Sequence, residues 1–202
     1  MELDDKIFNI LQKHTKALLL ALGYRDFPTG CHSERVHGLS KEIGAHYGLS
    51  NNEINALVIA ASFHDIGKIG IPDQILLKPS QLDKAEWETM KQHSEIGEKI
   101  MGSTGLEGSQ QAALLIRHHH EHYNGMGYPD KLSGENIPIC SRIISIADSY
   151  DAMAVTRSYH RARAHLEIMD ILHKETGSKH DPELMRAFCE IIESSKFKTT
   201  QI

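Results

Sequence analysis

One apolar segment of the chain ends abruptly on a histidine and an aspartate. The segment INALVIAASF, Ile54 to Phe63, is followed at once by His64-Asp65. Because it is apolar on nearly all sides, we expect a central helix whose end is at least partly buried. A buried carboxylate is costly unless a cation or hydrogen-bond donors accompany it. Taken alone, the dipeptide allows two interpretations: a helix-end aspartate bonded to Lys68 beside a satisfied core histidine, or a group that binds something.

Helical spacing of apolar residues recurs along the whole chain, and we find no convincing strand pattern. Ser50 to Glu53 has the capping-box form for the helix described above, and Asp181-Pro182 is a typical start for the last helix. The pattern predicts an all-α bundle with one domain, to which the first helix could be an appendage. The expected helices span residues 3–23, 30–47, 50–67, 83–100, 109–120, 139–156, 164–175 and 181–195.

Composition narrows the function classes. The chain has 202 residues and a formal net charge of -5, which argues against binding to duplex nucleic acid. Its three cysteines are far apart and form no Cys-x-x-Cys pair, so a reducing compartment fits best. The N-terminus lacks the basic start of a signal peptide, and the longest apolar run is too short to span a bilayer. We therefore expect a cytoplasmic protein without membrane association.

Polar residues that suit a metal occur on several of the expected helices. His32 shares a helix face with apolar residues, and Asp148 stands on another mostly apolar helix. Together with His64-Asp65 they suggest a shared divalent cation, since histidine and aspartate suit zinc, iron or manganese. His93 and the adjacent pair His119-His120 could supply a second ion bridged by Asp65. From spacing alone, surface histidines near a loop explain this second set equally well.

The order and register of these motifs resemble one known family. The chain is similar to the HD-GYP subgroup of the HD-domain metal-dependent phosphohydrolases from about residue 26 to residue 160. The matching segments are DFPTGCHSERV (26–36), HDIGKIGIPDQILLKPSQL (64–82), MKQHSEIGEKI (90–100), HHEHYNGMGYP (119–129) and IPICSRIISIADSYDAMAVTRSYH (137–160). Long motifs in the right order are a far more specific signal than an isolated His-Asp pair.

The resemblance implies a function and a set of site residues. Members of the subgroup hydrolyse cyclic di-GMP, a bacterial second messenger, to linear pGpG and often on to GMP, with metal-activated water. Lys68 would contact the scissile phosphate as a catalytic group, and Arg157 and His160 would help to bind the dinucleotide. Asp65 would bridge two divalent ions, with iron or manganese favoured. The implied metal ligands are His32, His64, Asp65, His93, His119, His120 and Asp148.

Three positions depart from the pattern of the subgroup. Members with a third metal have a glutamate where this chain has Pro28, which predicts two ions. The usual aspartate of the Gly-Tyr-Pro loop is Asn124, and a basic position after Arg157 is His160. The resemblance also divides the chain into an N-terminal helix, residues 1–25, and a catalytic domain, residues 26–202. The N-terminal helix could serve in homodimerisation or connect to a sensor.

Two competing functions stay open at this stage. One is hydrolysis of another dinucleotide, such as cyclic GMP-AMP or a linear one. The other is a catalytically idle domain that binds a nucleotide or a partner protein. The composition of the Gly127-Tyr128-Pro129 loop predicts exposure, and in the subgroup this loop is a candidate contact for diguanylate cyclase domains. We further expect Trp87 and Met90 to lie in the core and residues 196–202 to form a frayed end.

Overall fold

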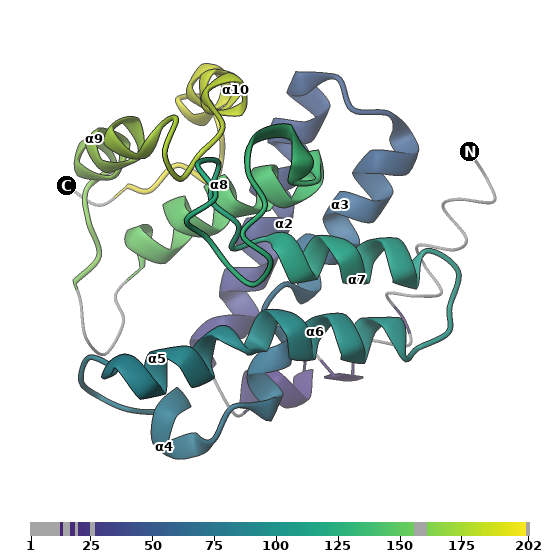
Figure 1. Ribbon diagram of the computed structural model, residues 1–202. Coiled ribbons are helices and arrows are strands. Elements are labelled where there is room, and N and C mark those ends of the chain that lie inside the picture. The colour runs from purple at the N-terminus through teal and green to yellow at the C-terminus, as the bar shows by residue number, and fades with distance from the viewer. Residues whose placement is uncertain (1–12, 14–16, 19, 25–26, 156–160, 201–202) are drawn as a thin grey trace.

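The helices of this chain pack as a bundle around α3 (Figure 1). The computed structural model describes residues 13, 17–18, 20–24, 27–155 and 161–200. Among these residues it contains helices, turns and loops and a single isolated bridge, so the all-α prediction is confirmed. The helices are α2 Phe27–Tyr47, α3 Asn51–Phe63, α4 Asp73–Leu76, α5 Lys84–Lys91, α6 His93–Gly102, α7 Ser109–His118, α8 Ile139–Ala154, α9 His165–Glu175 and α10 Pro182–Ile192, with short 3-10 helices η1 Ile66–Gly70 and η2 Gly134–Asn136.

The apolar helix α3 occupies the centre, as its sequence predicts. Ser50 and Glu53 form the expected capping box, in which each side chain accepts a hydrogen bond from the other residue's backbone N–H. From Ala56 to Phe63 every residue but one is buried, and the helix packs against α2, α7 and α8. Its regular turns end at Phe63, four residues earlier than expected. This places His64-Asp65 at the junction between α3 and η1.

The helix expected over residues 83–100 is two helices, α5 and α6, separated at Gln92. The reason lies in their different surroundings. α5 contains no buried residue, whereas α6 buries Gly97 and Met101 against its neighbours. Trp87, which we expected in the core, is 45% exposed on α5, and Met90 is half-buried. Apolar spacing predicted helical structure over this range, but it revealed neither the break at Gln92 nor that only α6 packs into the bundle.

The C-terminal residues are held against the bundle, so the prediction of a frayed end is wrong as far as Thr200. The Ser195 hydroxyl donates to Glu42 Oε2 at 2.6 Å, and the Thr199 backbone N–H donates to the Tyr150 hydroxyl at 3.0 Å. The Phe197 ring packs over Gly38 on α2, so closely that a β-carbon at Gly38 would lie 2.0 Å from its Cζ atom. The tail therefore braces α2 and α8, which carry His32 and Asp148.

Most of the first expected helix, residues 3–23, lies outside the described residues. Residues 17–18 and 20–24 are helical, and Leu22 is buried in the core. The proposed division of the chain at residue 25 stays a prediction. Among the described residues, no helix combines the length and apolarity needed to cross a membrane.

The contact between Gly38 and Phe197 generates a test of the tail. Gly38→Ala should destabilise the fold by about 1 kcal/mol, because the new methyl group displaces the ring, although alanine is the better helix former. In a Phe197→Ala background the same change should instead stabilise by about 0.5–1 kcal/mol. Urea denaturation of the two single variants and the double variant measures this sign reversal. Stabilisation by Gly38→Ala in the wild-type background would contradict the docked tail.

Candidate metal centre

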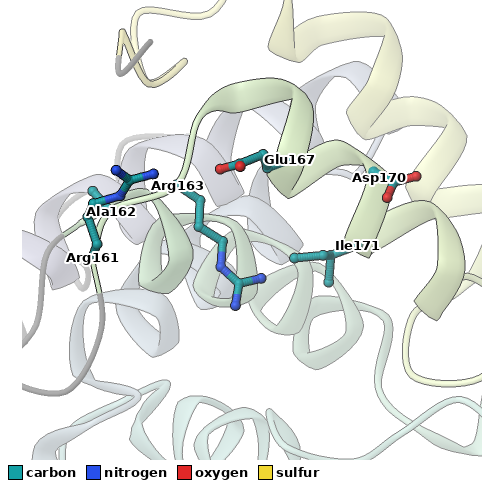
Figure 2. Close-up of a pocket in the computed structure, with 6 residues that line it drawn as sticks. All are labelled: Arg161, Ala162, Arg163, Glu167, Asp170 and Ile171. Atoms are coloured by element: carbon teal, nitrogen blue, oxygen red, sulfur yellow. The ribbon is translucent and has the colours of Figure 1, made fainter.

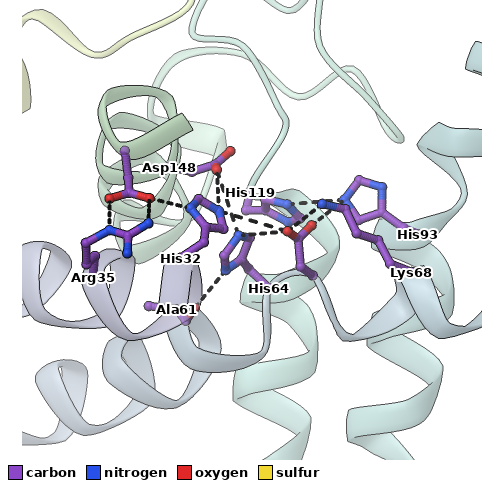
Figure 3. A network of polar contacts seen from close by, with 10 residues as sticks. His32, Arg35, Ala61, His64, Lys68, His93, His119 and Asp148 are labelled. Atoms are coloured by element: carbon purple, nitrogen blue, oxygen red, sulfur yellow. Dashed lines mark hydrogen bonds and ion pairs between the residues drawn. The ribbon is translucent and has the colours of Figure 1, made fainter. Parts of the chain in front are cut away.

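Seven side chains that the sequence singled out converge at one place in the bundle. Figure 3 labels His32, His64, His93, His119 and Asp148 among them. His32 comes from the first half of α2, and Asp148 from the middle of α8. The other five stand at or next to helix ends: His64, Asp65, His93, His119 and His120. Because α7 ends at His118, the adjacent pair that follows it is free of the 100° separation of a regular helix. The structure therefore brings together all the residues implied as metal ligands.

Backbone carbonyls orient three of the imidazoles. In each case Nδ1 donates to the carbonyl three residues earlier in the chain. The pairs are His64 with Ala61 at 2.7 Å, His93 with Met90 at 2.8 Å, and His119 with Ile116 at 2.6 Å. A proton held on Nδ1 leaves the lone pair of a neutral imidazole on Nε2. Three Nε2 atoms are therefore available as ligands.

The fourth oriented histidine uses a carboxylate that the sequence reasoning missed. His32 Nδ1 lies 2.6 Å from Asp151 Oδ2, and Arg35 donates to both oxygens of Asp151 at 2.6 and 3.0 Å. Asp151 stands three residues after Asp148 on α8, so both acids occupy one face of an otherwise apolar helix. That spacing is a signal that could have identified it. A carboxylate behind a ligating histidine fixes the ring and raises its basicity.

The side chains form two groups with an aspartate between them. His32, His64 and Asp148 make one group, and His93, His119 and His120 make the other; within each group the ligand atoms lie within 4.8 Å of one another. Asp65 reaches both groups. Its Oδ2 lies 3.5 Å from His64 Nε2, and its Oδ1 lies 3.7 Å from His93 Nε2. The two oxygens of one carboxylate thus face different groups.

The pKa of His32 differs from the pKa values of the histidines in the other group. Burial lowers the pKa values of His93, His119 and His120, that of His119 to about 3. Burial also opposes the charged form of His32, but contacts with the Asp148 and Asp151 carboxylates outweigh it and raise the pKa to about 9. Near neutral pH and without a metal, His32 is therefore a cation, whereas the other three are neutral.

The donor atoms fit a cation. His64 Nε2 is buried and has no hydrogen-bond partner among the described residues, and His32 Nε2 lies 3.1 Å from Asp148 Oδ1, another proposed ligand of the same group. His93 Nε2 and His119 Nε2 lie 3.5 Å apart, although both carry lone pairs once Nδ1 is protonated. Two ligands on one ion are separated by roughly 3–3.5 Å, since metal–nitrogen distances are about 2.1 Å. Both groups could hold a metal ion.

Lys68 lies beside the Asp65 carboxylate. Its Nζ is 2.6 Å from Asp65 Oδ2, which is the contact that the simpler interpretation of the dipeptide requires. Burial would raise the pKa of Asp65, but Lys68 and then the neighbouring histidines hold it well below its usual range. The lysine therefore keeps the Asp65 carboxylate ionised. The rest of that interpretation fails, because the Nε2 atom of His64 is not satisfied among the described residues.

Gly67 joins the two groups through backbone packing. We expected this glycine to end the preceding helix, but it lies inside η1. A β-carbon there would lie 1.8 Å from the His93 carbonyl oxygen and 2.5 Å from Gly97 N. Only glycine allows η1 to approach the start of α6 this closely. The approach sets the distance between Asp65 and His93.

The Gly-Tyr-Pro loop packs inward, contrary to the exposure predicted for it. Gly127 is buried, and a β-carbon on it would lie 2.2 Å from His122 N. The Tyr128 ring lies over His120, with centroids 4.9 Å apart. Asn124, the departure from the usual aspartate, accepts a hydrogen bond from the Met126 N–H at 3.0 Å. Its amide therefore makes a turn contact that needs no charge.

His118, which the sequence left unassigned, anchors this loop to α7. His118 Nε2 lies 2.8 Å from Asp130 Oδ2, and Arg117 donates to both oxygens of Asp130 at 2.7 and 2.8 Å. The Asp130 N–H donates to Glu121 Oε1 at 2.7 Å. The residues that flank His119 and His120 thus also fix the end of the loop.

Two predicted substrate-binding residues, Arg157 and His160, lie outside the described residues. The side chain of Pro28, on which the count of ions depends, also lies outside them. A hollow near this gap is formed by Arg161, Ala162, Arg163, Glu167, Asp170 and Ile171 (Figure 2). It contains none of the candidate ligands, so it is separate from the metal centre.

Comparisons with known proteins give a family match over most of this chain. The HD domain model matches residues 16–184. A cyclic di-GMP phosphodiesterase of Thermotoga maritima is 38% identical over 190 residues, covering 94% of this chain and 50% of that protein. The 3'3'-cGAMP-specific phosphodiesterase 2 of Vibrio cholerae is 36% identical over 170 residues, covering 84% of this chain and 33% of that protein. The chain thus spans half or less of the length of these relatives.

A solved structure shares the fold. The HDG"Y"P protein Bd1817 of Bdellovibrio bacteriovorus matches with a TM-score of 0.66 at 18% identity, over 95% of this chain and 61% of that one. At this identity the likeness concerns the fold alone.

The packing of Gly67 predicts a selective defect. Gly67→Ala should destabilise the protein by about 1–3 kcal/mol, because the new methyl group meets backbone atoms that cannot rotate away. Gly48→Ala, whose β-carbon would meet no atom within 4 Å, controls for loss of glycine but carries the strain of a positive φ. The midpoint temperature of unfolding and the amount of metal bound should both be lower for Gly67→Ala than for Gly48→Ala. Wild-type metal uptake by Gly67→Ala would contradict a role for this contact in spacing Asp65 and His93.

Proposed function

The chain belongs to the HD-domain family, and we propose that it is a metal-dependent phosphodiesterase that hydrolyses cyclic di-GMP. One observation carries the proposal: two groups of three ligand atoms with the two oxygens of Asp65 directed at one group each. A pair of neighbouring cation sites is the arrangement that phosphodiester hydrolysis uses. The relative named as a cyclic di-GMP phosphodiesterase supports the substrate.

We assign one ion to each group. His32, His64 and Asp148 would hold the first and His93, His119 and His120 the second, and Asp65 would offer one oxygen to each. Iron or manganese suits this mixture of imidazole and carboxylate ligands. When bound, the two ions supply Lewis-acid chemistry that lowers the pKa of a water molecule and neutralises phosphate charge. The limit of two ions follows from Pro28 and is part of the proposal.

The protein's own side chains position and neutralise the substrate. Lys68, whose Nζ is already at the bridging carboxylate, would turn its charge to a non-bridging oxygen of the scissile phosphate. Arg157 would hold the dinucleotide by the bidentate contacts that a guanidinium makes with phosphate, and His160 would assist it. The product is linear pGpG, with further hydrolysis to GMP where the linear product rebinds.

Two alternatives differ in substrate and in class. Cyclic GMP-AMP is the first, supported by the similarity to a cGAMP-specific enzyme. A catalytically idle domain that binds a nucleotide or a partner is the second. The complete ligand set disfavours it, because idle domains have no need to keep seven such side chains around one point. Three further expectations also stay predictions: a homodimer, a cytoplasmic location, and contact with a diguanylate cyclase domain through Gly127-Tyr128-Pro129. Because this loop packs inward, Met126 is the apolar residue that it exposes.

A substrate panel tests the function. Protein loaded with manganese or iron should hydrolyse cyclic di-GMP faster than cyclic GMP-AMP or cyclic di-AMP, with pGpG released first. Asp65→Ala should lose at least about 100-fold in kcat, since changes behind a metal ligand alone cost about 10–100-fold. Asp170→Ala is the matched control, because Asp170 is an exposed acid that pairs with Lys174 on α9.

Two outcomes would contradict this proposal. Folded, metal-loaded protein that binds a dinucleotide without cleaving it would point to the idle domain. Wild-type activity of Asp65→Ala with two ions bound would contradict the bridging role.

The different pKa values of the two groups predict the proton balance of metal binding. Because His32 is a cation below its raised pKa of about 9, an ion on its group displaces its proton. The group of His93, His119 and His120 is already neutral, since burial lowers those pKa values. At about pH 8, where an ordinary imidazole is neutral, filling both sites should release about one proton from the imidazoles, in addition to a proton lost by a metal-bound water.

Calorimetry in buffers of different ionisation enthalpy counts these protons. Affinity of the His32 group should fall by about tenfold for each pH unit below about 9. Asp151→Asn removes a carboxylate that raises the pKa of His32, so it should lower the imidazole part of the proton count toward zero. Release of several protons by the wild-type protein, or the same count in Asp151→Asn, would be inconsistent with the assignment.

A further inference from the structure

One face of α5 presents an exposed indole beside the candidate metal centre. Trp87 and Lys91 stand four residues apart, so they occupy the same face of the helix. α5 contains no buried residue, and Trp87 is 45% exposed. A tryptophan that only filled space would be expected to bury most of its large apolar surface. Packing among the described residues therefore accounts for only part of the apolar surface of Trp87.

The indole continues a row of rings that starts at the proposed ligands. Its centroid lies 6.3 Å from that of Tyr128, edge to face. Tyr128 in turn lies 4.9 Å from His120 and 6.5 Å from His93. Lys91 Nζ stands 5.7 Å above the Tyr128 ring and forms a surface ion pair with Glu88 Oε2 at 2.8 Å, a weak contact for which a phosphate would compete. An aromatic surface and a positive charge thus border the centre on the side of the second group.

This combination suits a nucleotide better than a small phosphate ester. Exposed aromatic faces stack on nucleobases, and a neighbouring cation favours the phosphate backbone. A cyclic dinucleotide whose one phosphate sits at the metal centre must place its bases and its other phosphate nearby. The face of α5 provides both kinds of contact next to Tyr128, which itself lies over His120.

We propose that Trp87 is a substrate-binding residue that stacks on a guanine base of the cyclic dinucleotide. The inference rests on the proposed function for its substrate, but it assigns a contact that the metal centre itself does not require. Stacking on one base is worth roughly 5- to 150-fold in affinity. Lys91 contributes charge next to the stacked base.

The chain has a single tryptophan, which makes the contact directly observable. Titration of metal-loaded protein with cyclic di-GMP should quench its fluorescence, because contact with a stacked base gives the excited indole a non-radiative path of decay. The product pGpG should quench it as well, so that turnover during the titration does not remove the signal. Ribose 5-phosphate, which has a phosphate but no base, should leave the emission unchanged. Binding of cyclic di-GMP without any change in emission would overturn the stacking contact.

Kinetics separate stacking from structural support. Trp87→Ala should raise KM for cyclic di-GMP by about tenfold with a smaller change in kcat. Its kcat/KM for bis(p-nitrophenyl) phosphate, which lacks a purine, should stay within about twofold of wild type. Trp87→Phe should recover much of the loss. Leu114→Ala on α7 is the matched control, since Leu114 is 46% exposed, nearly the same as Trp87. Equal losses on both substrates would overturn the proposal in favour of a structural role.

The two readouts also separate this inference from the proposed function. Quenching by cyclic di-GMP without hydrolysis would support the stacking contact and contradict the phosphodiesterase. Hydrolysis of cyclic di-GMP with an unchanged KM in Trp87→Ala would support the phosphodiesterase and contradict the stacking contact. If the protein neither binds nor hydrolyses any cyclic dinucleotide, both the stacking contact and the proposed function are overturned.

Discussion

Imidazole lone pairs that face one another inside the protein are the constraint on which the rest of the structure depends. His93 Nε2 and His119 Nε2 approach within 3.5 Å, while their Nδ1 atoms are occupied by backbone carbonyls. Neither ring can satisfy the other, and burial keeps both neutral by lowering their pKa values. Such an arrangement is unfavourable without a cation. It persists because the surrounding helices fix each ring from behind.

The bundle provides that support through contacts of several kinds. The central helix α3 is held by apolar packing, and its end delivers His64 and Asp65. Backbone contact at Gly67 brings Asp65 to the start of α6. At the other group, Asp151 and Arg35 fix His32. The polar centre is thus expensive to bury, and the apolar core around α3 offsets that cost.

Two structural features connect the centre with the outer parts of the protein. The C-terminal tail packs Phe197 on α2 and bonds to Tyr150 on α8, so it holds the helices that carry His32 and Asp148. At the second group, Tyr128 lies between His120 and the exposed Trp87. The first connection supports the helices that carry two of the proposed metal ligands. The second extends the proposed site toward solvent, where we propose that a substrate larger than a phosphate binds.

Apolar periodicity was enough to predict the fold class and the helix at the centre, because it is a local property that burial then enforces. The side chains that meet there were identified in full only through the resemblance to a known family, since spacing alone left the second group of histidines open. How the helices use these patterns depends on tertiary packing. It divided residues 83–100 into one exposed and one packed helix, docked the C-terminal tail and turned the Gly-Tyr-Pro loop inward. It also added Asp151 to the site and moved Gly67 from a helix end to a backbone contact. The physical reason is that each of these outcomes depends on a neighbour distant in sequence, whose position no local pattern specifies.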